Sequence, residues 1–242
     1  MKIYYIHHSC FIVETKSSFL TFDFFESKKS VRNSDFEFED LLKNMLNSNK
    51  EIYVFSSHSH HDHYNSDILK WESNKVIHYI FSDDIKAHNK TKEIHYLKQN
   101  EEITLNKLKV NTFTSTDEGV SFLVNVDNIN IFHAGDLNWW KWNGDTKQDE
   151  ENMENAFKDA INDIVNSNIS IDVAFFPVDG RLKENYLVGG KYFIEHLSPK
   201  LFIPMHFWDN FNVVSSFKNS HVKDYKNTKI IDISHSNEIL NI

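Results

Sequence analysis

The stretch His58-Ser59-His60-His61-Asp62-His63 follows the apolar run Ile52-Tyr53-Val54-Phe55 and precedes a helical start at Asn65-Ser66. Histidine and aspartate side chains bind metal ions in their deprotonated forms, and the spacing here is H-x-H-x-D-H. Alternate residues of an extended segment share one side, so His58 and His60 are expected to point together. The turn into the helix then directs Asp62 and His63 toward a second point. This arrangement suits two divalent ions, and the alternative is a histidine-rich loop in solvent.

Length and composition favour an ordinary globular protein. The chain has 242 residues, of which 40% are hydrophobic and 25% are charged, so it forms one large domain or two small ones. A formal net charge of −9 argues against a nucleic acid partner, because binding phosphates requires clustered lysine and arginine. Cys10 is the single cysteine and cannot form an intrachain disulfide. We therefore expect a small-molecule substrate and no nucleic acid partner.

The location of the protein is also an expectation from sequence. The first residues lack the long apolar segment and small-residue cleavage site of a signal peptide. No apolar run reaches the roughly 20 residues that a membrane-spanning helix needs. We expect a cytoplasmic protein with no membrane partner, and the oligomeric state cannot be read from the sequence.

Hydrophobic periodicity predicts a chain rich in strands, with helices concentrated in its second half. Strands of an opening antiparallel meander are expected at 2–6, 11–14 and 19–25, and a hairpin is expected around Asp127-Asn128. The further predicted strands are 52–56, 76–81, 94–97, 102–105, 109–113, 120–126, 129–132, 171–176, 201–206 and 229–233. The predicted helices are 40–46, a short one through 68–71, 149–165, about 189–197 and about 210–218.

The order of these elements indicates the fold class. A strand-rich first half and an αβαβ second half follow each other without a linker rich in glycine, proline or serine. We predict an α/β protein whose residues 1–242 form a single domain, a four-layer αββα sandwich of two sheets covered by helices.

Two later residues resemble the first motif in kind. Asp136 follows a strand that ends in His-Ala-Gly, and His206 follows the strand that ends in Pro204-Met205. The series H-x-H-x-D-H, G-D and P-M-H resembles the metallo-β-lactamase-fold hydrolases across nearly the whole chain. The segments 8–14, 171–178 and 202–207 resemble, within that superfamily, the ascorbate-6-phosphate lactonase-like branch of small cytoplasmic hydrolases.

This resemblance implies a dinuclear metal site. His58 and His60 would bind the first ion, and Asp62, His63 and His206 the second, while Asp136 bridges both. Zn²⁺ is the expected metal, and Mn²⁺ or Fe²⁺ are alternatives. A hydroxide between the two ions, held by Asp62 and Asp136, would attack an ester, lactone, amide or phosphodiester of a small molecule.

The chain departs from the family pattern at one ligand. Most members have another histidine before the strand that leads to the bridging aspartate, but this chain has none between His95 and His133. Asp117 is the substitute that we expect, and His133 is a second candidate. An oxygen ligand would make the first site harder, so that it takes Mn²⁺ or Fe²⁺ as readily as Zn²⁺.

Other residues have both functional and structural interpretations. His8 is expected near the metal pocket or as an ordinary buried histidine, and Trp139-Trp140-Lys141-Trp142 as a pocket wall or as core. Asp179 and the basic residues after it could orient an anionic substrate or be solvated. The remaining histidines are expected to be structural or on the surface: His61, His78, His88, His95, His196, His221 and His235.

Two rival functions remain open at this point. Some relatives of the fold bind iron and carry out redox chemistry, although no flavin or rubredoxin-like segment accompanies this chain. A non-catalytic binding module that has lost part of the metal site is the other. The identity of the bound metal and the effect of its removal discriminate among the three.

Overall fold

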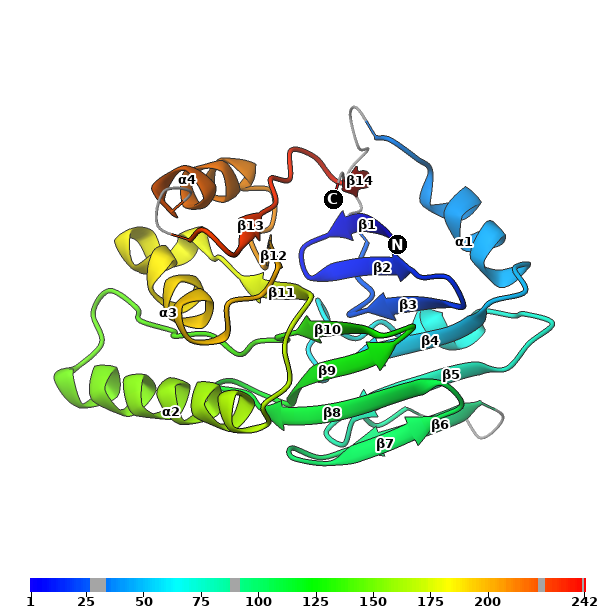
Figure 1. Cartoon of the computed structure of the whole chain (residues 1–242), viewed down its shortest axis with the longest axis horizontal. Coiled ribbons are helices and arrows are strands. Elements are labelled where there is room, and N and C mark those ends of the chain that lie inside the picture. The colour runs from blue at the N-terminus through cyan, green and yellow to red at the C-terminus, as the bar shows by residue number, and fades with distance from the viewer. Residues whose placement is uncertain (27–33, 88–91, 222–224, 241) are drawn as a thin grey trace. The chain divides into compact units, whose positions relative to one another are not determined.

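The computed structural model describes residues 1–26, 34–87, 92–221, 225–240 and 242. The chain divides into two compact units, residues 1–98 with 234–242 and residues 99–233, and each contains one seven-stranded sheet (Figure 1). Strands and helices occur in both units, which confirms the mixed α/β class with two sheets. The single domain spanning 1–242 stays a prediction.

The first unit begins with an antiparallel meander and continues in parallel. Its strand order is β14-β1-β2-β3-β4-β5-β6, antiparallel from β14 to β3 and parallel from β3 to β6. The predicted meander is therefore confirmed. The elements are β1 (Lys2–His7), β2 (Cys10–Glu14), β3 (Ser18–Phe22), α1 (Phe38–Leu46), β4 (Glu51–Ser56), the 3₁₀ helix η1 (Ser66–Lys70), β5 (Ile77–Ser82), β6 (Glu93–Leu97) and β14 (Glu238–Leu240).

One face of this sheet packs on helix α1. The helix buries Phe38, Leu41 and Met45 in a cluster with alternate residues of the central strands, such as Val54 and Tyr79. Their neighbours in sequence point to the opposite face because side chains alternate along a strand. Burial of an apolar side chain of this size contributes about 1.5–3 kcal/mol.

The second unit has the reverse arrangement of parallel and antiparallel pairs along the chain. Its order is β13-β12-β11-β10-β9-β8-β7, antiparallel from β7 to β10 and parallel from β10 to β13. The elements are β7 (Glu102–Leu105), β8 (Leu108–Thr114), β9 (Val120–Val126), β10 (Ile129–His133), α2 (Lys147–Asn166), β11 (Val173–Pro177), the 3₁₀ helix η2 (Gly180–Leu187), α3 (Val188–Leu197), β12 (Leu201–Met205), α4 (Phe211–His221) and β13 (Lys229–Ile230).

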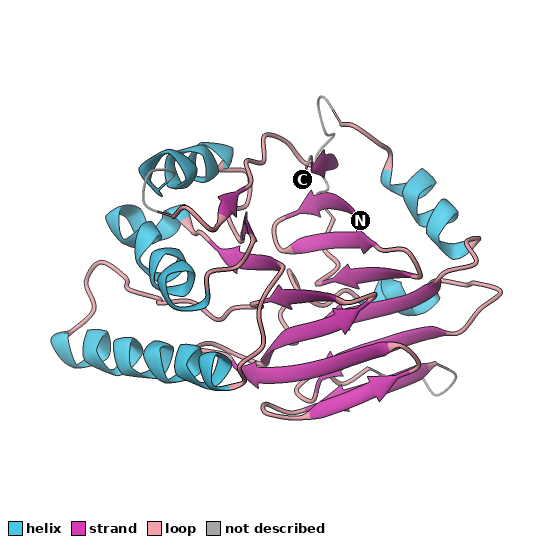
Figure 2. Ribbon diagram, in the orientation of Figure 1, coloured by secondary structure: helices cyan, strands magenta, loops and turns pink. Residues whose placement is uncertain are grey.

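Three helices cover one face of the second sheet (Figure 2). Phe157 of α2 and Phe193 of α3 both pack on Phe176 of β11, and Phe217 of α4 stacks on Phe202 of β12. The predicted hairpin is also present, since Val126 pairs with Ile129 across a two-residue turn. Both turn residues have positive φ, 51° and 62°, which is typical of a tight hairpin turn with the twist of its strands.

The parallel strands decide where the polar loops lie. The carboxyl ends of neighbouring parallel strands meet at one edge of a sheet. In the first unit the residues after β3 and β4 share such an edge, and Asp23 N–H donates to the carbonyl of Phe55. In the second unit the residues after β10, β11 and β12 do the same. The loops that follow the predicted ligand strands therefore gather within each unit.

Several predicted elements differ from the structure in their bounds. The strand predicted at 19–25 ends at Phe22, because Asp23 takes a left-handed φ of 44°. The strand predicted at 229–233 is reduced to the two residues of β13, and strand β14 was not predicted. Among the described residues, no helix is both long enough and apolar enough to cross a membrane.

A capping box begins the 20-residue helix α2. The Thr146 hydroxyl accepts from the Asp149 N–H, and the Asp149 carboxylate accepts from the Thr146 N–H. We expect Thr146→Ala to lower the free energy of unfolding by about 1 kcal/mol, because the Asp149 N–H in the first turn of the helix loses its acceptor. Urea denaturation measures the change. Thr146→Ser, which keeps the hydroxyl, is the control, and an equal loss in both variants would contradict the role of the cap.

Candidate metal centre

The histidine motif lies in the loop that follows β4, as predicted. His58 and His63 are buried, whereas His60 and His61 are exposed. His58 Nε2 is 3.0 Å from His60 Nδ1, and the rings of His58 and His63 pack at 4.1 Å. The structure thus brings His58 and His60 together at their ring nitrogens, as the alternate spacing predicts.

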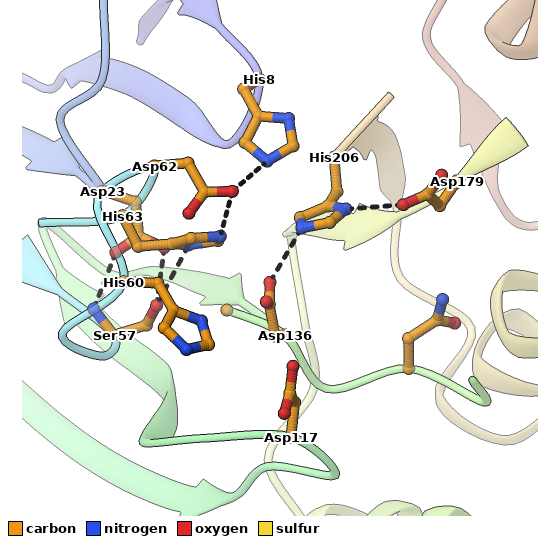
Figure 3. Close-up of polar contacts among 12 residues, drawn as sticks. His8, Asp23, Ser57, His60, Asp62, His63, Asp117, Asp136, Asp179 and His206 are labelled. Atoms are coloured by element: carbon orange, nitrogen blue, oxygen red, sulfur yellow. Dashed lines mark hydrogen bonds and ion pairs between the residues drawn. The ribbon is translucent and has the colours of Figure 1, made fainter. Parts of the chain in front are cut away.

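A buried carboxylate, Asp23, organises these rings (Figure 3). It accepts hydrogen bonds from the Ser57 N–H at 2.7 Å and from the Ser57 hydroxyl at 2.7 Å. Its Oδ2 is also 2.7 Å from His63 Nδ1. A carboxylate only accepts, so His63 Nδ1 carries the proton and donates it. A buried charge with three donors is stable where a lone one would be costly.

The same pattern fixes the tautomers of two histidines. With its proton on Nδ1, neutral His63 has an unprotonated Nε2. The Ser57 hydroxyl donates its hydrogen bond to Asp23, so its oxygen is left to accept one from His58 Nδ1 at 3.0 Å. His58 Nδ1 therefore carries the ring proton, and Nε2 of neutral His58 is unprotonated as well. An unprotonated ring nitrogen is the form that ligates a metal, and a hydrogen bond from the other nitrogen fixes the ring's orientation.

Asp62 lies beside His8, at the start of the chain. The carboxylate is 3.3 Å from His8 Nε2 and 3.9 Å from His63 Nε2, and the backbone N–H of His8 donates to the Tyr5 hydroxyl. Burial alone would raise the pKa of Asp62, but the hydrogen bond from His8 and the nearby imidazoles lower it well below its usual range. Asp62 is thus an anion at neutral pH, in contact with two histidines.

In the second unit, His206 lies between two aspartates. Its Nδ1 is 3.0 Å from Asp179 and its Nε2 is 3.3 Å from Asp136 (Figure 3). Burial alone would lower the pKa of His206, yet the two carboxylates raise it to about 10. Burial would likewise raise the pKa of Asp179, but His206 and Arg181 lower it to about 2. Asp179 therefore orients His206 so that Nε2 faces Asp136.

These contacts suit a divalent cation. With a pKa of about 10, His206 holds a proton on Nε2 that faces Asp136 Oδ1 at neutral pH, and a divalent cation could replace this proton between the two atoms. A tetrahedral ion bound at 2.0–2.1 Å separates its ligand atoms by about 3.3 Å. The His58–His60 and His206–Asp136 contacts, at 3.0 and 3.3 Å, are close to this spacing. The donor sets therefore fit a divalent metal such as Zn²⁺.

Asp117 and His133, the two substitutes for the missing histidine, lie in different surroundings. Asp117 is exposed on the loop after β8, and its neighbour Thr116 donates to the Asn138 carbonyl, which holds this loop near Asp136 (Figure 3). His133 is fully buried against Phe175, and its Nδ1 accepts from the Gly135 N–H. Asp117 is therefore the better candidate of the two for a metal ligand beside Asp136.

The tryptophans after Asp136 are predicted from the sequence to form either a pocket wall or part of the core, and they differ in their surroundings. Trp139 packs on Phe157 of α2 and belongs to the helix core. Trp140 donates from its indole N–H to the Asp136 carbonyl and packs on the His206 ring at 5.4 Å. Trp140 therefore supports the loop that carries Asp136.

Three residues of the site have left-handed backbones that favour glycine. His8, Asp23 and His206 have φ of 56°, 44° and 63°. Each such conformation costs of order 1 kcal/mol or more and persists only where surrounding contacts hold it. In each case the turn directs the side chain out of the end of a strand.

The sequence analysis missed Asp23 and Ser57, and it did not connect Asp179 with His206. A signal was present, since Asp23 directly follows a buried strand, as Asp136 and His206 follow theirs. His88 and the side chain of His221 lie outside the part of the chain that the structure describes.

Asp23→Asn tests this organisation of the rings. An amide has one acceptor oxygen in place of two, so at least one buried donor of Ser57 or His63 loses its partner. We expect the free energy of unfolding of the metal-free protein to fall by about 1–3 kcal/mol in urea denaturation. Asp67→Asn, at an exposed carboxylate, should change it by less than about 0.5 kcal/mol. Equal effects of the two substitutions would contradict the role of Asp23.

Comparison with solved structures shows the fold. Igni18, a metallo hydrolase from Ignicoccus hospitalis, aligns with a TM-score of 0.67 and 18% identity over 98% of this chain and 96% of that chain. YhfI, a metallo-β-lactamase fold protein from Bacillus subtilis, has a TM-score of 0.60 and 10% identity over 98% and 97%. CmlA, a diiron β-hydroxylase from Streptomyces venezuelae, has a TM-score of 0.66 and 11% identity over 100% of this chain and 54% of that chain.

The sequence itself also matches a family. None of the curated proteins matches the chain. The model of the beta-lactamase superfamily domain matches residues 2–151, which include the H-x-H-x-D-H motif and Asp136. Because this match spans more than half of the 242 residues, the chain belongs to the beta-lactamase superfamily and has the metallo-β-lactamase fold.

Proposed function

We propose that this protein is a metal-dependent hydrolase of a small molecule. The proposed ligands of two divalent ions are His58, His60, Asp62, His63, Asp136 and His206, with Asp117 as a further oxygen ligand. Zn²⁺ is the proposed metal, and Mn²⁺ or Fe²⁺ are alternatives. The family and its fold support metal-dependent hydrolysis as the class of reaction. The choice of ligands and of metal rests on the residues of this chain.

The observation that carries the proposal is the pair of buried carboxylates behind the histidines. Asp23 accepts a hydrogen bond from His63 Nδ1 and one from the Ser57 hydroxyl, whose oxygen accepts from His58 Nδ1. Asp179 accepts one from His206 Nδ1 in the second unit. In each of these rings the hydrogen bond at Nδ1 leaves Nε2 as the nitrogen that could bind an ion. These partners are the outer hydrogen bonds that metal-ligating histidines have.

The chemistry divides between the ions and the protein. When bound, two divalent ions lower the pKa of a water between them toward about 7 and polarise a carbonyl or phosphoryl oxygen. In this proposal Asp62 and Asp136 would accept hydrogen bonds from the attacking water and orient it. Trp140 packs edge-on against the His206 ring at 5.4 Å and so supports the orientation of that ligand.

The proposed substrate is a small molecule with an ester, lactone, amide or phosphodiester bond. The net charge of −9 disfavours a polyanionic substrate held by its backbone. The resemblance to the ascorbate-6-phosphate lactonase-like branch makes lactones and sugar phosphates the first compounds to screen. Arg181 is bound to Asp179 and lies over the Trp142 ring, so we do not assign it to an anionic substrate.

Two rival functions predict different metal contents. An iron-dependent redox enzyme is the rival favoured by the oxygen-rich donors Asp117 and Asp136, and it would contain iron with a visible absorption band. A binding module that has lost its metal site would fold without any metal and could not be loaded.

Elemental analysis of the protein purified without added metal tests the ligands. We expect at least two equivalents in the wild type, as the two ions of the proposed hydrolase site need, and fewer in His58→Ala and in His206→Ala. His61→Ala, at an exposed histidine within the same motif, should retain the wild-type content. A folded protein that neither contains metal nor accepts it would refute the hydrolase proposal. Iron in place of zinc would favour the redox rival.

Asp136→Ala tests the reaction. We expect metal-dependent turnover of nitrophenyl esters, lactones or bis-nitrophenyl phosphate to fall by about 100-fold or more, because the attacking water loses its acceptor and the metals a ligand. Steady-state rates at saturating Zn²⁺ measure the effect. Asp163→Ala, at an exposed carboxylate of α2, is the control, and full activity of Asp136→Ala would remove this residue from the mechanism.

A further inference from the structure

A second histidine cluster lies on strands β5 and β6 of the first unit, away from the motif loop in sequence. The parallel register pairs His78 with Glu93 and Ile80 with His95. Glu93 and His95 are two residues apart on β6, so they point to the same face of the sheet. The neighbours of His78, Ile77 and Tyr79, pack on the α1 side. The three polar side chains therefore share the face of the sheet opposite α1.

Their ligand atoms converge on a single point. Glu93 Oε1 is 3.2 Å from His78 Nδ1 and 3.2 Å from His95 Nε2, and the three residues each offer one ligand atom within 4.8 Å of those of the other two. A tetrahedral Zn²⁺ with bonds of 2.0–2.1 Å requires ligand atoms about 3.3 Å apart. Two imidazoles and one carboxylate are also a donor set that zinc takes in proteins.

The cluster is held in place before any ion binds. The Tyr53 ring stacks on His78 at 5.2 Å, and the rings of His78 and His95 stack at 6.4 Å. The His78 side chain is 10% exposed and that of His95 22%, while Glu93 is 46% exposed. An ion can therefore enter from the Glu93 side and meet two imidazoles whose freedom is already restricted.

The charge of Glu93 is directed to these histidines. Within the described part of the chain, its ion pairs are with His78 and His95, and no lysine or arginine forms one with it. A cation bound here would not have to displace a basic side chain. The alternative is that Glu93 accepts a hydrogen bond from each ring and binds no ion.

We propose that His78, Glu93 and His95 form a Zn²⁺ site that fastens the edge strand β6 to β5. Three protein ligands leave the fourth position to water. Among the described residues, β6 is the last strand of its sheet and pairs with β5 alone, so a bound ion would add a second link between these two strands. The site uses none of the residues of the proposed hydrolase and does not rest on that function.

The test is a Zn²⁺ titration of the metal-stripped full chain by calorimetry. We expect one binding event beyond those of the proposed hydrolase ligands, weakened at least about tenfold in Glu93→Gln and in His95→Gln. His196→Gln, at a histidine of α3 outside the cluster, is the matched control. His58→Ala should keep the event as well, which separates this site from the proposed catalytic metals.

Amide hydrogen exchange gives a local readout that needs no variant. Zn²⁺ should slow exchange in residues 94–97 of the wild type by about tenfold or more, because a bound ion opposes opening of β6. It should not slow these amides in Glu93→Gln. Identical titrations of wild type and Glu93→Gln, or no slowing in β6 of the wild type, would overturn the site and leave the hydrogen-bonded carboxylate.

Discussion

The buried carboxylate of Asp23 is the interaction on which the histidine motif depends. It lies at the end of β3, where a left-handed backbone turns it toward the loop after β4. Two donors of Ser57 and the Nδ1 of His63 compensate its charge. Removing a partner would leave a charge buried without compensation, which costs far more than the net gain of one hydrogen bond. The constraint therefore fixes the loop and the tautomers together.

The second unit solves the same problem with different residues. Asp179, after β11, holds His206, after β12, and Arg181 neutralises the outer side of Asp179. In both units the carboxylate and the histidine come from adjacent parallel strands, whose carboxyl ends lie at one edge of the sheet. The parallel pairs of strands in each sheet thus bring the carboxylate next to the histidine that it orients.

The same reasoning separates the two kinds of histidine cluster in the first unit. His58 and His63 are buried and their outer nitrogens are engaged by a network that begins at Asp23. His78 and His95 lie on the flat face of a sheet, and a single carboxylate lies between them. In the first cluster, further hydrogen bonds hold the histidines from behind, as in a site for catalytic metals. In the second cluster the histidines contact one shared carboxylate, as in a site that links an edge strand to its neighbour.

The sequence by itself determined the α/β class, the two sheets, nearly all the strands and helices, and the family. Apolar periodicity and the H-x-H-x-D-H spacing are local properties, so residues such as His58 and Asp136 could be chosen without a structure. Only the tertiary structure decided that Asp23 and Asp179 orient His63 and His206, since these pairs lie 40 and 27 positions apart. It also brought His78 to Glu93 and His95, because register between parallel strands is set by packing across the sheet and leaves no local signal.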